Sequence, residues 1–181
     1  NATISDATGT LTIVDDDAAP SLSINDVNFT EATGNATFTV TLSEASGQDV
    51  TVDYATSNNT ATGGSDYTSS TGTVTILAGN TTQTFNVPVS EDTLDEVNET
   101  ATLTLSSATN ATISDATGTL TIVDDDATPS LSINDVSYTE SGTGGNATFT
   151  VTLSAASGQD VEVDYTTSNG TATAGADYTA S

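Results

Sequence analysis

Apolar residues alternate with threonine along most of this chain, and this alternation constrains the fold more than any other feature. In ATFTVTLS (36–43), Phe38, Val40 and Leu42 point to one side and the threonines to the other. A period of two is typical of strands with one buried face, and β-branched threonine suits the outer face. The pattern recurs in LSIND (22–26), DVTVDYATS (49–57), TVTIL (73–77), TQTFNVPV (82–89), TATLTLSS (100–107) and GTLTIV (118–123). It predicts about seven half-buried strands.

A long internal repeat divides the chain. Residues 1–18, NATISDATGTLTIVDDDA, recur unchanged at 110–127, and PSLSINDV at 20–27 recurs at 129–136. A spacing of 109 residues has the size of an independent domain rather than of a solenoid unit. We expect 1–17 to be the C-terminal strand of one repeat, 20–126 a complete domain, and 129–181 the N-terminal part of the next. The predicted fold class is all-β, with tandem immunoglobulin-like antiparallel β-sandwiches of about seven strands.

The charge of the chain excludes several classes of partner. It has 25 acidic residues and no Lys, Arg or His, which gives a formal net charge of -25. Binding to nucleic acid or to an anionic membrane surface depends on Lys and Arg, so we expect neither. No run approaches the roughly 18 apolar residues of a membrane helix, so direct membrane insertion is not expected. The chain has no cysteine, and a bound metal can stabilise a domain that lacks disulfides. The expected partners are cations.

The acidic residues of 20–126 fall into two groups. Asp53 on a threonine face, and Glu44 and Asp49 beside a hairpin turn, are interpreted as solvated surface, while Asp26 and Asp115 suit turns. The others gather where predicted strands end, at Glu31, Asp66, Glu91, Asp92, Asp95, Glu96, Glu99 and Asp124 to Asp126. Adjacent aspartates repel one another by about 1 kcal/mol per pair even in water. Carboxylates clustered at one pole of a sandwich, without His or Cys, predict a calcium site.

Four motifs follow one another in this unit. They are FTE at 29–31, TATGGSDY at 60–67, an acidic run after the VPV of 87–89, and IVDDD at 122–126. YTE at 138–140 and TATAGADY at 171–178 repeat the first two. This order resembles the Calx-beta family, the calcium-binding domain of sodium/calcium exchangers that also recurs in extracellular adhesion proteins.

The resemblance implies Ca²⁺ as the cofactor and a set of ligands. For the complete unit it implies Glu31, Asp66, Glu91, Asp92, Glu96, Asp124, Asp125 and Asp126. For the next repeat it implies Glu140 and Asp177, and for the preceding one Asp15, Asp16 and Asp17.

Several functions are compatible with a calcium-binding repeat. We expect a structural or adhesive segment of a long secreted or cell-surface protein or fibre, in which calcium rigidifies modules and junctions, with lateral self-association a further possibility. A calcium-sensing regulatory domain and a glycan- or surface-binding module that uses the threonine faces are the alternatives. Glu91 and Glu96 could be read as a glycosidase pair, but we expect no enzyme, since there is no His, Cys or Lys for other chemistry. The expected location is extracellular or at the cell surface.

Asn-x-Thr occurs nine times, at Asn1, Asn28, Asn35, Asn58, Asn80, Asn98, Asn110, Asn146 and Asn169. These are acceptor sites for N-glycosylation in a secreted protein. Strands rich in threonine also produce the pattern by composition alone. Both interpretations stay open.

Short linkers join the predicted modules. Asp126 is followed by Ala127 and Thr128 before Pro129, and residues 17–20 have the same arrangement. Proline fixes its own φ angle and pushes the preceding residue toward an extended conformation. Successive modules are therefore expected to lie end to end.

Overall fold

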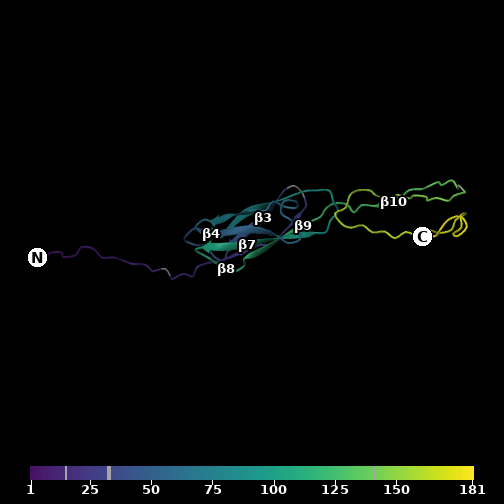
Figure 1. The fold of residues 1–181 in the computed structure, drawn as a ribbon. Coiled ribbons are helices and arrows are strands. Elements are labelled where there is room, and N and C mark those ends of the chain that lie inside the picture. Colours follow the sequence, from purple (N-terminus) through teal and green to yellow (C-terminus); the bar gives the residue numbers. More distant parts are fainter. Residues whose placement is uncertain (15, 32–33, 141) are drawn as a thin grey trace.

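The computed structural model describes residues 1–14, 16–31, 34–140 and 142–181. Figure 1 shows an extended N-terminal segment, a central sandwich, and a long hairpin that continues from the opposite end of the sandwich. The central unit contains β1 (Ser21–Ile24), β2 (Val27–Thr30), β3 (Gly34–Leu42), β4 (Val50–Asn58), β5 (Thr71–Ile76), β6 (Thr82–Val89), β7 (Glu99–Thr109), β8 (Thr112–Ile113) and β9 (Thr117–Val123).

These strands form two sheets, which confirms the predicted all-β sandwich. One sheet has the order β6-β3-β1-β8 and the other β2-β9-β7-β4-β5. The seven predicted runs correspond to β1, β3, β4, β5, β6, β7 and β9. The two further strands, β2 and β8, are only four and two residues long, and both pair parallel, β2 with β9 and β8 with β1. The sandwich is thus not wholly antiparallel.

Asn25 and Asp26 carry the chain from one sheet to the other. The side-chain oxygen of Asn25 accepts the N–H of Thr39 in β3 at 2.6 Å, and the Asp26 carboxylate accepts the N–H of Thr119 in β9 at 2.7 Å. Each residue is therefore bonded to a different sheet, which determines where β1 ends and β2 begins. The interpretation of Asp26 as a turn residue agrees with this geometry.

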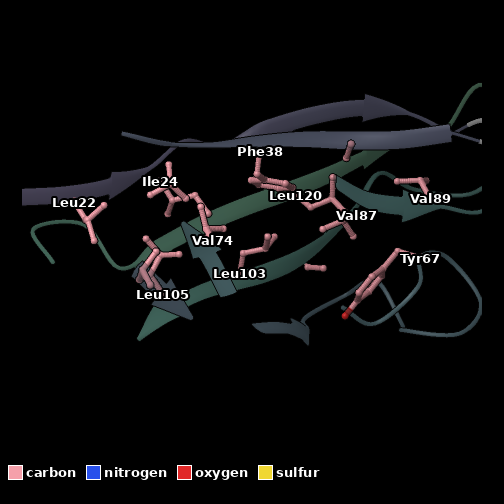
Figure 2. Packing of buried hydrophobic residues seen from close by; sticks show 14 of the residues in the cluster. Leu22, Ile24, Phe38, Tyr67, Val74, Val87, Val89, Leu103, Leu105 and Leu120 are labelled. Atoms are coloured by element: carbon pink, nitrogen blue, oxygen red, sulfur yellow. The ribbon is translucent and has the colours of Figure 1, made fainter. Parts of the chain in front are cut away.

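The core lies between the two sheets, as Figure 2 shows. Phe38 of β3, Leu103 of β7 and Leu120 of β9 are each fully buried, as the alternation of their strands requires. Burying one such side chain contributes about 1.5–3 kcal/mol to folding. Near β5 and β6, Tyr54 stacks on Phe85 with ring centroids 3.9 Å apart, so aromatic rings bridge the two sheets at that side.

Outside the central unit, regular structure is sparse among the described residues. Residues 131–133 form β10 (Leu131–Ile133), which pairs with β11 (Val151–Leu153) in the register that β1 and β3 use. Residues 1–14 contain no strand, although the identical residues 110–123 include β8 and β9. The reason is that β8 and β9 have β1, β2 and β7 as neighbours. The domain limits at 17, 20, 126 and 129 stay a prediction. The described residues include no helix that could span a membrane.

Two glycines with the same local sequence allow a test of this packing. Gly118 lies in β9, where an added Cβ would meet the Asn25 carbonyl oxygen at 2.7 Å, whereas Gly9 has nothing within 4 Å. We expect Gly118→Ala to lower the unfolding free energy by about 1–3 kcal/mol, because the strand crossover must shift. Chemical denaturation measures the change. Gly9→Ala is the matched control, and equal effects of the two substitutions would contradict the assignment of β9.

Candidate metal centre

Carboxylates from five parts of the fold converge at one end of the sandwich, which is the end nearer the C-terminal hairpin in Figure 1. Glu31 follows β2, Asp66 lies between β4 and β5, Asp92 and Glu96 lie between β6 and β7, Glu99 begins β7, and Asp124 and Asp126 follow β9. We call these seven residues the acidic pole. The charges that raise the pKa of Glu31, Glu96 and Glu99 belong to other residues of this acidic pole. Strand ends far apart in sequence therefore form one anionic surface.

Glu31 is the most enclosed carboxylate of the pole. Its residue is 7% exposed, and its backbone N–H donates to the Val123 carbonyl oxygen at 2.7 Å, which extends the pairing of β2 with β9. Burial first, and then the charges of Asp92, Glu96, Asp124 and Asp126, raise the pKa of Glu31 to about 7. The fold thus holds a carboxyl group where ionisation is costly and where no side chain of the sequence can offer a positive charge.

Glu99 belongs to the same environment, although the family resemblance did not assign it as a ligand. Its pKa is also raised to about 7, first by burial, then by a hydrogen bond with Asp66 and by the charges of Asp66, Glu96 and Glu31. A hydrogen bond that raises the pKa of Glu99 is one that its protonated form donates to Asp66. The signal available in the sequence was its place at a strand end within the acidic run at 91–99.

The TATGGSDY motif is a tight turn that holds Asp66 in place. Its carboxylate accepts the Thr62 N–H at 2.5 Å, and its carbonyl oxygen accepts the Ser90 N–H at 2.9 Å, directly after β6. The following Tyr67 is fully buried, and its hydroxyl donates to the side-chain oxygen of Asn58 at 2.7 Å. Gly64 has a φ of 105°, a backbone conformation that favours glycine. The buried tyrosine thus anchors the turn that presents Asp66.

The loop between β6 and β7 is tied to the aspartates after β9. The Asp124 carboxylate accepts the Glu96 N–H at 3.2 Å, and the Asp124 N–H donates to the side-chain oxygen of Asn98 at 3.2 Å. Within the loop, the Asp92 carboxylate accepts the Leu94 N–H at 2.8 Å. Burial and the neighbouring charges of Asp92 and Asp66 raise the pKa of Glu96. These bonds bring Asp92 and Glu96 toward the end of β9.

The remaining residues of the complete unit that the resemblance implies lie less centrally. Asp125 is exposed between Asp124 and Asp126, as alternation along an extended chain requires. Glu91 and Asp92 act on Asp126, whose pKa is raised by burial and by Asp124 and Asp125. Glu91 is itself exposed.

In the neighbouring repeats the described residues that the resemblance implies as ligands are exposed, in contrast to the enclosed Glu31 of the central unit. Asp16 and Asp17 are exposed on the N-terminal segment, and Asp15 lies outside the described residues. Glu140 is exposed, unlike Glu31. Asp177 does repeat the local turn, because its carboxylate accepts the Thr173 N–H at 2.8 Å. The turn motif therefore forms without a complete sandwich around it.

Four of the nine Asn-x-Thr asparagines use their side chains in hydrogen bonds within the protein. The oxygens of Asn58 and Asn169 accept hydrogen bonds from Tyr67 and Tyr178, and Asn98 bonds Asp124. Asn110 has a φ of 61°, and its side-chain nitrogen donates to the Asp49 carbonyl oxygen at 2.9 Å. All nine asparagines are exposed, which includes the other five at Asn1, Asn28, Asn35, Asn80 and Asn146. Glycosylation stays a prediction.

The chemistry of the acidic pole suits a hard divalent cation. All of its side-chain donors are carboxylate oxygens, the ligand type that calcium prefers and that zinc and copper sites seldom use alone. Among the described residues, no three acidic side chains already have the spacing of a metal centre. Burial, and then the charges of neighbouring carboxylates, raise the pKa of Glu31 and Glu99. The residues fit a calcium ion once their side chains close around it.

Comparison with known proteins gives a consistent result for the whole chain. The family model described as the Calx-beta domain matches residues 15–126 and 124–181. Similar solved structures include the apo-form Calx CBD1 domain, with 21% identity, a TM-score of 0.56, and coverage of 60% of this chain and 100% of that one. CBD12 from CALX1.2 has 21% identity and a TM-score of 0.56, covering 64% of this chain but only 49% of that structure. The Calx CBD2 domain has 14% identity and a TM-score of 0.51, covering 58% and 86%. No curated protein matches the chain in sequence.

The raised pKa values give the metal-free chain a defined pH dependence. Glu31 and Glu99 keep their protons up to about pH 7 when folded, against 4.5 for an ordinary glutamate, so the folded state binds more protons between these values. The stability that the two protonated carboxyl groups contribute is fully present below the unfolded-state pKa of 4.5. It is lost as the pH rises through the folded-state pKa of about 7. We expect the urea midpoint in chelator to fall between about pH 5 and pH 8 for this reason. Glu31→Gln should flatten that dependence. Glu44→Gln, on an exposed turn, should leave it unchanged, and an unaltered slope in Glu31→Gln would contradict the role of this carboxyl group.

Proposed function

The chain belongs to the Calx-beta domain family, and from that premise we propose that residues 20–126 form a calcium-binding module whose acidic pole holds the metal. The proposed ligands are Glu31, Asp66, Asp92, Glu96, Glu99, Asp124 and Asp126, with Glu91 and Asp125 at the margin. Counterparts in the adjacent repeats would form equivalent poles.

One observation carries the proposal. Seven carboxylates from five separate parts of the fold converge in a sequence that contains no basic side chain. Unpaired carboxylates beside a buried core are costly, and ion pairs are the usual compensation in proteins. Here the compensating charge must come from solution. A divalent cation carries two positive charges, so fewer bound ions are needed than with a monovalent cation.

The chain's own residues prepare the pole in different ways. Asp66 is fixed in orientation by the turn that Tyr67 anchors, and Glu31 is enclosed by the pairing of β2 with β9. Asp92 and Glu96 lie on a loop that is bonded to Asp124. A bound calcium would supply positive charge and accept six to eight oxygens, including backbone carbonyls and water. Ligands fixed by a turn, by strand pairing and by a bonded loop are thus combined in one site.

We further propose that the modules belong to a structural or adhesive segment of a long extracellular or cell-surface protein, without a catalytic role. Three features support this proposal. The repeat at 1–18 and 110–127 is identical, the linkers are only a few residues long, and the chain carries no basic patch for cytosolic partners. Calcium at the pole would neutralise the surface that faces the next repeat. Carbohydrate on the exposed Asn-x-Thr sites and lateral association into a fibre are part of the same proposal.

Calcium binding is tested by isothermal titration calorimetry of the full chain. Asp124→Asn should weaken binding roughly tenfold or more, because the substitution removes the negative charge of a candidate ligand while its amide oxygen can still accept the Glu96 N–H. Asp53→Asn is the matched control, since Asp53 accepts the Thr73 hydroxyl at 2.6 Å on the open sheet face. Absence of any heat of binding at millimolar calcium, or equal effects of the two substitutions, would contradict the proposed site.

The rigidifying role is tested by small-angle X-ray scattering with calcium and with chelator. We expect a larger maximum dimension and a more uniform cross-section with calcium, because unneutralised carboxylates repel at the junction. The difference should be greatest at low ionic strength, where the Debye length is about 30 Å at 0.01 M. An identical scattering curve in both conditions would show that calcium does not determine the stiffness.

A further inference from the structure

The loop between β6 and β7 contacts a turn of the following repeat at Ser157 and Gly158. The carbonyl oxygen of Asp95 accepts the Gly158 N–H at 3.2 Å and the Ser157 hydroxyl at 3.4 Å. The Asp95 carboxylate accepts the hydroxyl of Thr128, in the linker, at 3.0 Å. One residue therefore holds both the linker and the turn, through its backbone and its side chain separately.

Gly158 lies where a larger residue would have to displace the Glu96 side chain. A Cβ at that position would collide with the Glu96 side chain, whose Cδ lies 2.8 Å away. Its φ is not in the left-handed region that favours glycine, so the constraint is the neighbouring loop and not the backbone conformation. The glycine lets the loop and the turn approach closely enough for the hydrogen bond to Asp95.

The complete module contains the same turn in an open setting. ASGQDV occurs at 45–50 and again at 156–161. In both copies the serine hydroxyl accepts the N–H of the glutamine two residues later, Gln48 at 3.0 Å and Gln159 at 3.1 Å, so the turn is built locally. In the described part of the chain, nothing lies within 4 Å of a Cβ added at Gly47. The glycine of one turn is thus covered by the loop, while the glycine of its twin is open, although Ser46 and Asp49 of that twin accept hydrogen bonds from Gly79 and Ala78 of the same module.

We propose that this Ser-Gly-Gln-Asp turn is the docking element by which each repeat is seated on the repeat before it, and that its partner is the β6–β7 loop of that preceding repeat. The turn at 157–160 docks on the loop of module 20–126. The turn at 46–49 has the shape for the corresponding loop of another copy of the module. The contact uses a backbone carbonyl, an amide and hydroxyl groups and needs no metal ion as a ligand, so it goes beyond calcium binding.

Carboxylates on both sides of the contact repel each other and oppose docking, so the population of the docked state should depend on salt concentration. Beside the contact lies a crevice of about 350 Å³ whose lining includes Asp95, Asp160 and Glu162. These carboxylates repel across the junction, and added salt screens them. The docked state should therefore be more populated at higher ionic strength, in the absence of calcium.

Amide hydrogen exchange measured by NMR on the unmodified chain tests the proposal directly. Gly47 and Gly158 have the same flanking residues, so their intrinsic exchange rates are equal. Gly158 should exchange roughly two- to tenfold more slowly in chelator at moderate salt, since one hydrogen bond to Asp95 protects it. The ratio should rise with salt. Equal rates at all salt concentrations would overturn the proposal.

A pair of substitutions gives a second test. Gly158→Val should abolish the docked state and broaden the distance distribution from small-angle scattering, whereas Gly47→Val at the uncovered turn should not. Both are measured in chelator, so the result is independent of whether the pole binds calcium. Far-UV circular dichroism confirms that the β-structure is retained. Indistinguishable scattering of the two variants would overturn the proposal even if calorimetry showed calcium binding.

Discussion

Electrostatic repulsion that the chain cannot neutralise by itself is the constraint on which this structure depends. With 25 acidic residues and no basic one, every carboxylate must be solvated, protonated or paired with an ion from solution. The two sheet faces therefore carry mostly threonine and serine, and the acids gather in turns and at strand ends. Where they gather most densely, burial raises the pKa of Glu31 and Glu99 to about 7. The fold concentrates its electrostatic cost at one end and keeps the core apolar.

Much of the sandwich could be predicted from alternation, since all seven predicted runs form strands. The two short strands could not: β8 has only two residues, and β2 follows β1 after Asn25 and Asp26, so only the crossover and the parallel neighbours show that it is a separate strand. Residues 1–14 also show that local sequence alone does not determine whether a strand forms. Their sequence is identical to 110–123, yet they form no strand. The strands that β8 and β9 pair with are β1, β2 and β7, and these already lie beside β8 and β9 in the central unit. Local sequence thus encodes the capacity to form a strand, and the neighbouring strands decide whether it forms.

The candidate site was predictable for a related reason. Strands of a sandwich run from pole to pole, so acids at strand ends were expected to converge, and Glu31, Asp66, Asp92, Glu96, Asp124 and Asp126 do so. Glu99 had been grouped with these acids but not assigned a role, because only the fold reveals its hydrogen bond with Asp66. The exposure of Asp125 follows from alternation beyond the last strand and was not anticipated, since the three aspartates had been treated as a unit. The buried Tyr67 and its bond to Asn58 explain why the turn motif contains tyrosine at all.

The crossover at Asn25 and Asp26 has a mechanical consequence. It places β2 parallel to β9, with four rungs from Val27 and Leu120 to Thr30 and Val123. Tension along the chain pulls β2 from its N-terminal end and β9 from its C-terminal end, so the two strands are drawn past each other in opposite directions. All four rungs then carry the force together, in shear, instead of opening one after another as in a peeled hairpin. A module closed in this way resists stretching at β2 and β9, once the force has passed β1.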